Sequence, residues 1–158
     1  MTPTGMRRRS TYLAHSQSLI RFANGASMYA WIGVAVGGAL GSVARHGVNR
    51  LVHQEWPLLR FPLATVIVNI LGCCVIGVLA GLVATGRLPM RTNWREFVFV
   101  GILGGFTTFS TFGLDTITLV RSGDSSRAFL NILLHVVCGL AAVHFGIVAV
   151  ERFGVITR

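Results

Sequence analysis

Long apolar runs separated by short polar connections make up most of the chain after residue 27. A helix that crosses about 30 Å of hydrocarbon needs about 20 residues. Four runs are long enough, and they cover approximately residues 28–50, 62–84, 97–120 and 128–150. The connections carry arginine, proline or glycine, and none is long enough for a soluble catalytic domain. The pattern predicts an all-α integral membrane protein with four transmembrane helices in one domain, residues 28–152.

The two ends of the chain lack this pattern. Residues 1–27 hold four arginines among polar residues, without an apolar core of signal-peptide length, which predicts a disordered basic tail. The run Arg7-Arg8-Arg9-Ser10 faintly suggests a twin-arginine signal, but the residues after it are too polar for a targeting segment. Residues 153–158 form a short C-terminal tail.

The third apolar run contains the sequence Gly-Gly-Phe-Thr-Thr-Phe-Ser-Thr-Phe at residues 104–112. Two glycines followed by four hydroxyl residues are unfavourable for a continuous membrane helix and predict a break. Irregular backbone at that depth survives only where it is buried in protein or lines a polar cavity, because each unsatisfied backbone group costs several kcal/mol in hydrocarbon. The break is therefore a candidate ion site.

Composition supports a membrane protein, since 53% of the residues are hydrophobic and 19 are glycine. The net charge of +9 comes from arginine alone, and these arginines lie mostly in tails and connections, which argues against a nucleic-acid-binding face. If the helices alternate in direction, one side holds nine arginines and the other five, or six against five without Arg7, Arg8 and Arg9. So weak a bias permits insertion in both orientations.

Small residues and cysteines within the runs have ordinary explanations. Gly33, Gly37 and Gly41 form a stripe on one helical face, and Gly77 and Gly81 repeat the spacing, which is typical of close helix packing. The three cysteines match neither a zinc nor a disulfide spacing, and we interpret them as small apolar side chains.

Several polar and aromatic residues inside the runs are candidates for chemistry. Asn69 needs a partner in its apolar span, either an interhelical hydrogen bond or a permeating anion. Phe109 and Phe112 share a helical face, and their electropositive ring edges can help coordinate an anion, although such a pair is ordinarily core packing. Thr108 and Thr111 form a neighbouring hydroxyl pair.

Asp115 is the only carboxylate of the third span, so it is expected at a vestibule or paired with an arginine. In the fourth span Asn131 and His135 lie at i and i+4 and predict one polar track, while His144 points roughly opposite. A buried neutral histidine bonded within its helix is the simpler alternative to a pH-sensitive pore group.

With these residues the chain resembles the CrcB or Fluc family of fluoride channels, and the resemblance covers nearly the whole sequence after the N-terminal tail. The run at 104–112 is similar to that family's motif, and Gly37-Gly38-Ala39-Leu40-Gly41-Ser42 with Arg45 supports it. So do Phe61-Pro62, Thr65, Asn69 and Gly72 in the second span.

The resemblance implies an antiparallel, dual-topology homodimer in the cell's plasma or inner membrane, through which fluoride leaves passively and the cell is protected from it. It implies a structural sodium ion held by backbone carbonyls of Gly104 and Thr107 from both subunits. It also implies a fluoride path along Asn69, Phe109, Phe112, Ser110 and Thr111, with Arg45 at a vestibule. The partner is a second copy or a homologous subunit. Conduction of this kind needs no enzyme chemistry.

The chain departs from the family pattern at two places. His135 stands near where the family usually has a small hydroxyl residue. We therefore hypothesise that conduction in this chain depends on pH. Asp115 stands where the family often has glutamate, one methylene longer with the same charge.

Three other classes explain the sequence less well. A small multidrug-resistance-type antiporter needs a carboxylate within its first span, and this span has none. A non-transporting assembly protein would leave the hydroxyl-rich third span unexplained. No combination of nucleophile with base, and no metal-ligand cluster, supports an enzyme.

Overall fold

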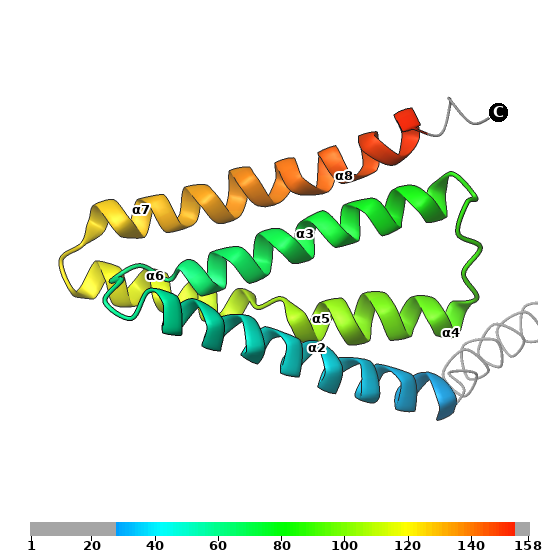
Figure 1. Ribbon diagram of the computed structural model, residues 1–158, viewed down its shortest axis with the longest axis horizontal. Helices are drawn as coiled ribbons and strands as arrows, with labels where there is room; N and C mark the ends of the chain where they lie inside the picture. The colour runs from blue at the N-terminus through cyan, green and yellow to red at the C-terminus, as the bar shows by residue number, and fades with distance from the viewer. Residues whose placement is uncertain (1–27, 154–158) are drawn as a thin grey trace, which may run out of the picture.

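The computed structural model describes residues 28–153, and this part of the chain is built of long helical segments without strands. The first two segments are α2 (Met28–Glu55) and α3 (Leu63–Ala84). Two further runs follow, Thr92–Arg121 and Ser125–Phe153 (Figure 1). The predicted all-α fold is therefore confirmed, while the two predicted tails lie outside the described residues, apart from Phe153.

The third and fourth runs are each composed of several pieces. The third contains α4 (Thr92–Arg95), the π-helical segment η1 (Glu96–Leu103), α5 (Gly104–Phe106) and α6 (Phe109–Arg121). The fourth contains α7 (Ser125–Leu133), the π-helical segment η2 (Leu134–Cys138) and α8 (Gly139–Phe153). π-Helical turns inside α-helices are often found at functional sites.

The helices run somewhat beyond the predicted spans, and local sequence explains where they end. α2 continues from the expected end at residue 50 to Glu55, because the first helix-breaking residue in this stretch is Pro57. α7 begins after Asp124, whose carboxylate accepts a hydrogen bond from the backbone N–H of Arg127. Gly86 and Gly123 follow α3 and α6 with positive φ angles of 70° and 81°, a conformation that favours glycine.

Two helix pairs form the body of the molecule: α3 packs on α8, and α2 packs on η1 and α5 (Figure 1). The glycine stripes make both contacts possible. A Cβ atom added to Gly41 would lie 2.1 Å from the carbonyl oxygen of Ile102, and one added to Gly77 would lie 2.4 Å from that of Val143. The predicted packing role of these stripes is confirmed.

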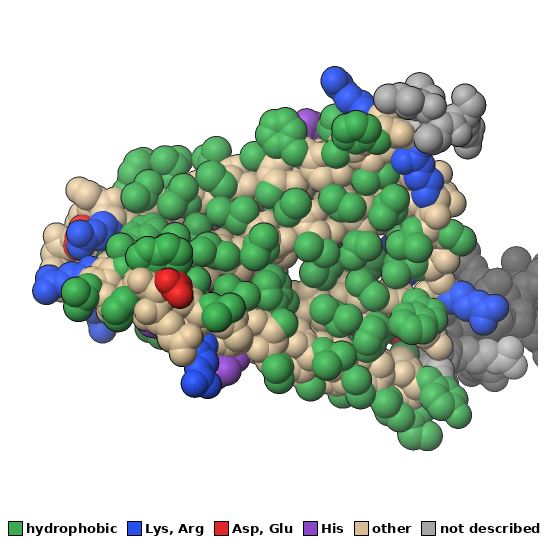
Figure 2. Space-filling view, viewed as in Figure 1, with side chains coloured by type: hydrophobic (Ala, Val, Ile, Leu, Met, Phe, Trp, Pro, Cys, Tyr) green, Lys and Arg blue, Asp and Glu red, His purple; other side chains and the backbone are tan. Residues whose placement is uncertain are grey.

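Three helical runs are long and apolar enough to cross a membrane: Leu63–Ala84, Thr92–Arg121 and Ser125–Phe153. α2 is long enough but does not reach the same hydropathy, since its second half carries Arg45, His46 and Arg50. Its role as a fourth span stays a prediction. Hydrophobic side chains cover the visible face, and the arginines gather mostly at its two ends (Figure 2), as lipid contact requires.

The helices alternate in direction. The start of α2, the connection between α3 and α4, and the end of α8 lie at one end of the molecule, and the other two connections lie at the opposite end (Figure 1). The two ends of the described chain and the connection between α3 and α4 therefore lie on one side, which is the division of arginines into nine and five given above.

Candidate functional site

The helical hydrogen bonding of the third run is interrupted at Thr107 and Thr108. Both residues take extended backbone angles, with φ −80° and ψ 160° at Thr107 and φ −151° and ψ 112° at Thr108. The N–H and the hydroxyl of Thr107 still donate to the carbonyl of Leu103, at 3.0 and 2.9 Å. The chain therefore leaves the helical path at Thr107, and Thr108 is the first residue whose N–H has lost its helical acceptor.

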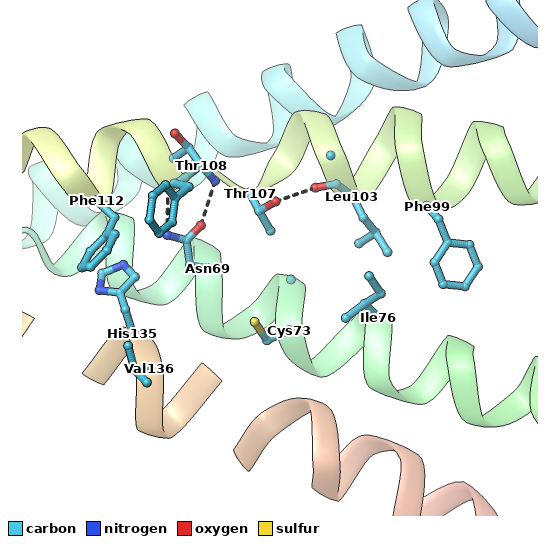
Figure 3. A pocket seen from close by; sticks show the side chains of 13 residues that line it. Asn69, Cys73, Ile76, Phe99, Leu103, Thr107, Thr108, Phe112, His135 and Val136 are labelled. Carbon is cyan, nitrogen blue, oxygen red and sulfur yellow. Dashed lines mark hydrogen bonds between the residues drawn. The ribbon is translucent and has the colours of Figure 1, made fainter. Parts of the chain in front are cut away.

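Asn69 of α3 supplies the hydrogen bonds that Thr108 loses. Its Nδ2 donates to the Thr108 carbonyl at 3.0 Å, and its Oδ1 accepts from the Thr108 N–H at 2.8 Å (Figure 3). The amide side chain therefore pairs with both backbone groups of one residue. The alternative of an interhelical hydrogen bond, weighed for Asn69 from the sequence, is the one the structure shows. One N–H of the amide remains unused by the described residues.

The interruption separates several backbone carbonyls from their usual partners, among them those of Gly104 and Thr107. In a continuous helix the Gly104 carbonyl would accept from the N–H of Thr108, and the Thr107 carbonyl would accept from that of Thr111. Here the Thr108 N–H goes to Asn69, and the Thr111 N–H goes to the Thr108 hydroxyl at 3.2 Å. The two carbonyls predicted as sodium ligands are thus among those that lose their i+4 donors.

Hydroxyl groups gather at the start of α6. The Thr108 hydroxyl caps this helix and lies 2.9 Å from the hydroxyl of Thr111 and 3.2 Å from that of Ser110. The predicted pairing of Thr108 with Thr111 is confirmed. Because hydroxyl hydrogens can rotate, this cluster can present either donors or acceptors to a neighbouring ion.

A cavity of about 410 Å³ lies beside the interruption. It is largely apolar, and its lining includes Asn69, Cys73, Leu103, Thr107, Phe109 and His135 (Figure 3). The rings of Phe109 and Phe112 lie with their centroids 5.3 Å apart, as the shared helical face predicts. Phe109 is 83% exposed, so most of its ring faces away from this chain.

His135 enters the same cavity and lies against Phe112, with ring centroids 4.4 Å apart and an interplanar angle of 35°. Its Nδ1 lies 2.8 Å from the backbone carbonyl of Asn131, and its Nε2 is buried without a hydrogen-bond partner among the described residues. Asn131 itself is fully buried and donates to the Thr116 hydroxyl at 2.9 Å.

The predicted polar track is therefore only half correct. His135 lines the cavity, but the side chain of Asn131 does not, because its amide turns toward Thr116 of α6. The sequence spacing assumed regular α-helical turns, whereas η2 begins at Leu134 and changes the angular relation of the residues around it. Thr116 was not among the predicted residues. Its position one turn after Phe112 could have indicated a helix-bonded hydroxyl there, and its hydroxyl does donate to the Phe112 carbonyl at 2.8 Å.

Asp115 lies at a second cavity of about 240 Å³, which Thr111 also lines. Its carboxylate accepts a hydrogen bond of 2.7 Å from the Thr65 hydroxyl. In the described part of the chain the ion pair is between Asp124 and Arg127, so Asp115 has no arginine partner there. The alternative of pairing with arginine is not seen among residues 28–153, and the position of Asp115 at a vestibule stays a prediction. Arg45 lines neither cavity.

The cysteines and acidic residues offer no conventional metal site. All three cysteines are free, and residues 28–153 contain no cluster of three or more histidine, cysteine or acidic side chains suited to a metal. Cys73 nevertheless lines the larger cavity, a position that the sequence alone did not reveal.

Taken together, these features define a polytopic helical membrane protein with an interrupted helix beside a polar-edged cavity. The CrcB family model, described as "CrcB-like protein, Camphor Resistance (CrcB)", matches residues 32–147. The chain belongs to this family.

The chain is also similar to curated relatives over most of its length. The chain is 45% identical over 124 residues to a protein of Opitutus terrae, covering 78% of this chain and 92% of that one. It is 46% identical over 119 residues to a protein of Paracoccus denitrificans, covering 75% and 92%. Both relatives carry the name "Fluoride-specific ion channel FluC".

Proposed function

We propose that the protein is a fluoride-selective channel through which cytoplasmic fluoride leaves down its electrochemical gradient, protecting the cell from fluoride. The observation that carries this function is the interruption at Thr107 and Thr108, held by Asn69 beside a cavity that the Phe109 and Phe112 rings help to line. The names of the relatives point to the same ion. No enzyme activity is part of this function.

The lining of the cavity suits an anion that gives up water. Fluoride is small and strongly hydrated, so a pore must replace its water by donors and oriented dipoles while holding it weakly enough for exit. The available donors are the unused N–H of Asn69 and whichever hydroxyl of Ser110 and Thr111 accepts from Thr108, because its own hydrogen stays unengaged. The edges of Phe109 and Phe112 carry positive electrostatic potential and extend the path through apolar surroundings.

One chain does not enclose this path. Phe109 is 83% exposed, and Leu114 and Ile117 on the same helix are 68% and 53% exposed. A second copy, or a homologous subunit, placed against α6 would cover these side chains and complete the pore. The near-equal arginine content of the two sides supports an antiparallel pair inserted in both orientations. Arg45, in the second half of α2, would then attract anions to a vestibule.

A sodium ion at the centre of such a pair fits the carbonyls found at the interruption. Gly104 is exposed, and both its carbonyl and that of Thr107 have lost their helical donors. Two such carbonyls from each copy would give four oxygen ligands, which suit a hard cation. The ion would join the two copies and would not itself move through the pore.

Fluoride efflux from liposomes tests this function. Liposomes carrying the purified protein are loaded with fluoride or chloride, and efflux is started by potassium charge compensation and read with an ion-selective electrode. We expect rapid fluoride loss, little chloride loss, and slower fluoride loss for Phe109→Ile. No efflux from a folded protein, with or without a homologous second chain, would favour an assembly protein instead.

A further inference from the structure

His135 is the one lining side chain of the larger cavity whose buried polar atom lacks a partner in the described part of the chain. Buried polar groups are hydrogen-bonded in the great majority of cases, and an unpaired one costs free energy unless a ligand or water satisfies it. Its Nε2 is therefore a polar atom at the cavity wall for which the described residues supply no partner.

The hydrogen bond at the other ring nitrogen determines what Nε2 presents. The backbone carbonyl of Asn131 can only accept, so the Nδ1 that lies 2.8 Å from it must carry a hydrogen. In the neutral imidazole only one nitrogen carries a hydrogen, and Nε2 is then left with a lone pair. A lone pair repels an anion. After protonation both nitrogens are donors, and Nε2 presents an N–H on a cationic ring.

The surroundings hold the ring in this orientation. Asn131 is fully buried and donates to Thr116, whose hydroxyl donates to the carbonyl of Phe112. This chain of bonds joins α7 to α6 on the side where the His135 ring lies 4.4 Å from that of Phe112. An imidazolium over an aromatic face is favoured by the ring quadrupole. The ring therefore has a supported position in both protonation states.

Few other charged or titratable groups share this environment. Cys73 of α3 lines the same cavity and is the other titratable side chain there among the described residues. On α6, Asp115 bonds Thr65 at the second cavity, and the charges at the start of α7, Asp124 and Arg127, pair with each other. On α8, His144 is exposed and lines neither cavity.

We propose that His135 is a proton-controlled fluoride ligand, which opposes the anion through its Nε2 lone pair when neutral and binds it through an Nε2–H when protonated. This inference rests on the fluoride-channel function proposed above. It predicts that fluoride conduction rises as the pH falls and the imidazole gains a proton.

Fluoride efflux at subsaturating fluoride, compared at about pH 7.5 and about pH 5.5, tests the proposal. Losses from protein-free liposomes at each pH are subtracted, since they report neutral HF crossing the lipid. We expect efflux through the wild-type protein to rise about tenfold in acid, as a new hydrogen bond to a charged group implies. His135→Ser should give flat efflux with pH, and the matched variant His144→Ser should keep the rise.

The outcomes separate the two proposals. Fluoride efflux that is flat with pH in the wild type, or that still rises in His135→Ser, would overturn the role of His135 and leave the channel function standing. No fluoride efflux at either pH would overturn both. If His135→Ser does not elute as a folded species, His135→Gln replaces it. Nitrogen NMR of the labelled imidazole provides a test without transport, and an Nε2–H tautomer at neutral pH would also overturn the proposal.

Discussion

Replacing Asn69 by alanine removes both hydrogen bonds that hold the interrupted helix to α3. Thr108 is only 9% exposed, so its N–H and carbonyl have little access to water once the amide is gone. The change deletes no large apolar side chain. Its effect therefore reports mainly on the pairing between Asn69 and the backbone.

The expected cost follows from the number of groups left without a partner. Each unsatisfied buried group costs about 1 to 3 kcal/mol, and two are affected. Side-chain hydrogen bonds in membrane proteins are measured at the lower end, on average about 0.6 kcal/mol. We expect Asn69→Ala to lower the free energy of unfolding by about 2 kcal/mol, between these estimates. The Thr108 N–H can recover part of this loss by bonding the Gly104 carbonyl in a continuous helix.

The free energy of unfolding is measured in detergent micelles by denaturant titration followed by circular dichroism, with fluoride efflux recorded on the same preparations. The control is Thr65→Val, which removes one hydrogen bond, that to Asp115, from a residue that is 7% exposed. We expect this control to cost about 1 kcal/mol or less. If Asn69→Ala costs no more than Thr65→Val and fluoride efflux is unchanged, the amide does not maintain the interruption.

Three further predictions concern packing, charge and sodium. Gly41→Ala should lower the free energy of unfolding by about 2 kcal/mol or more, because the new Cβ meets the Ile102 carbonyl, while Gly47→Ala, with no heavy atom within 4 Å, should be neutral or slightly stabilising in the same titration. Asp115→Asn should change the free energy of unfolding by less than about 0.5 kcal/mol, since an amide oxygen still accepts from Thr65. A decrease in this free energy as large as that caused by Asp115→Leu would contradict the prediction. Exchanging sodium for a large organic cation should lower the thermal unfolding temperature of the assembled protein, and an unchanged temperature would argue against a structural sodium ion.

The helical fold was predictable because lipid imposes a simple length and hydropathy rule on each span. The predicted runs overlap α2, α3 and the two composite runs, and the ends differ by a few residues where caps and Pro57 decide the boundary. The pairing of α3 with α8 was not predictable from the pattern alone. It depends on complementary surfaces, and the small residues on both partners, such as Gly77 of α3 and Gly146 of α8, do not by themselves say which helices pair.

The candidate site was predictable in its residue types and less so in its bonds. The glycines and hydroxyls at 104–112 indicated the interruption, but nothing in the spacing showed that Asn69 would pair with Thr108. Asn131 was predicted to share one polar track with His135 because a regular helix was assumed, and η2 alters that geometry. Side-chain partners across helices are set by three-dimensional packing, which one sequence does not specify.

The backbone groups exposed by an interruption in a membrane helix need hydrogen-bond partners. In this chain some of these groups have partners and others do not. Thr108 receives two bonds from Asn69, whereas the carbonyls of Gly104 and Thr107 receive neither of their usual donors. In hydrocarbon such carbonyls would be costly, so their persistence requires another source of positive charge or hydrogen at this place. The proposed cation shared between two copies would meet that requirement for the carbonyls. On the other side of the interruption, the Thr108 hydroxyl can donate to only one of the Ser110 and Thr111 hydroxyls, and the hydroxyl that accepts this bond keeps its own hydrogen for an anion.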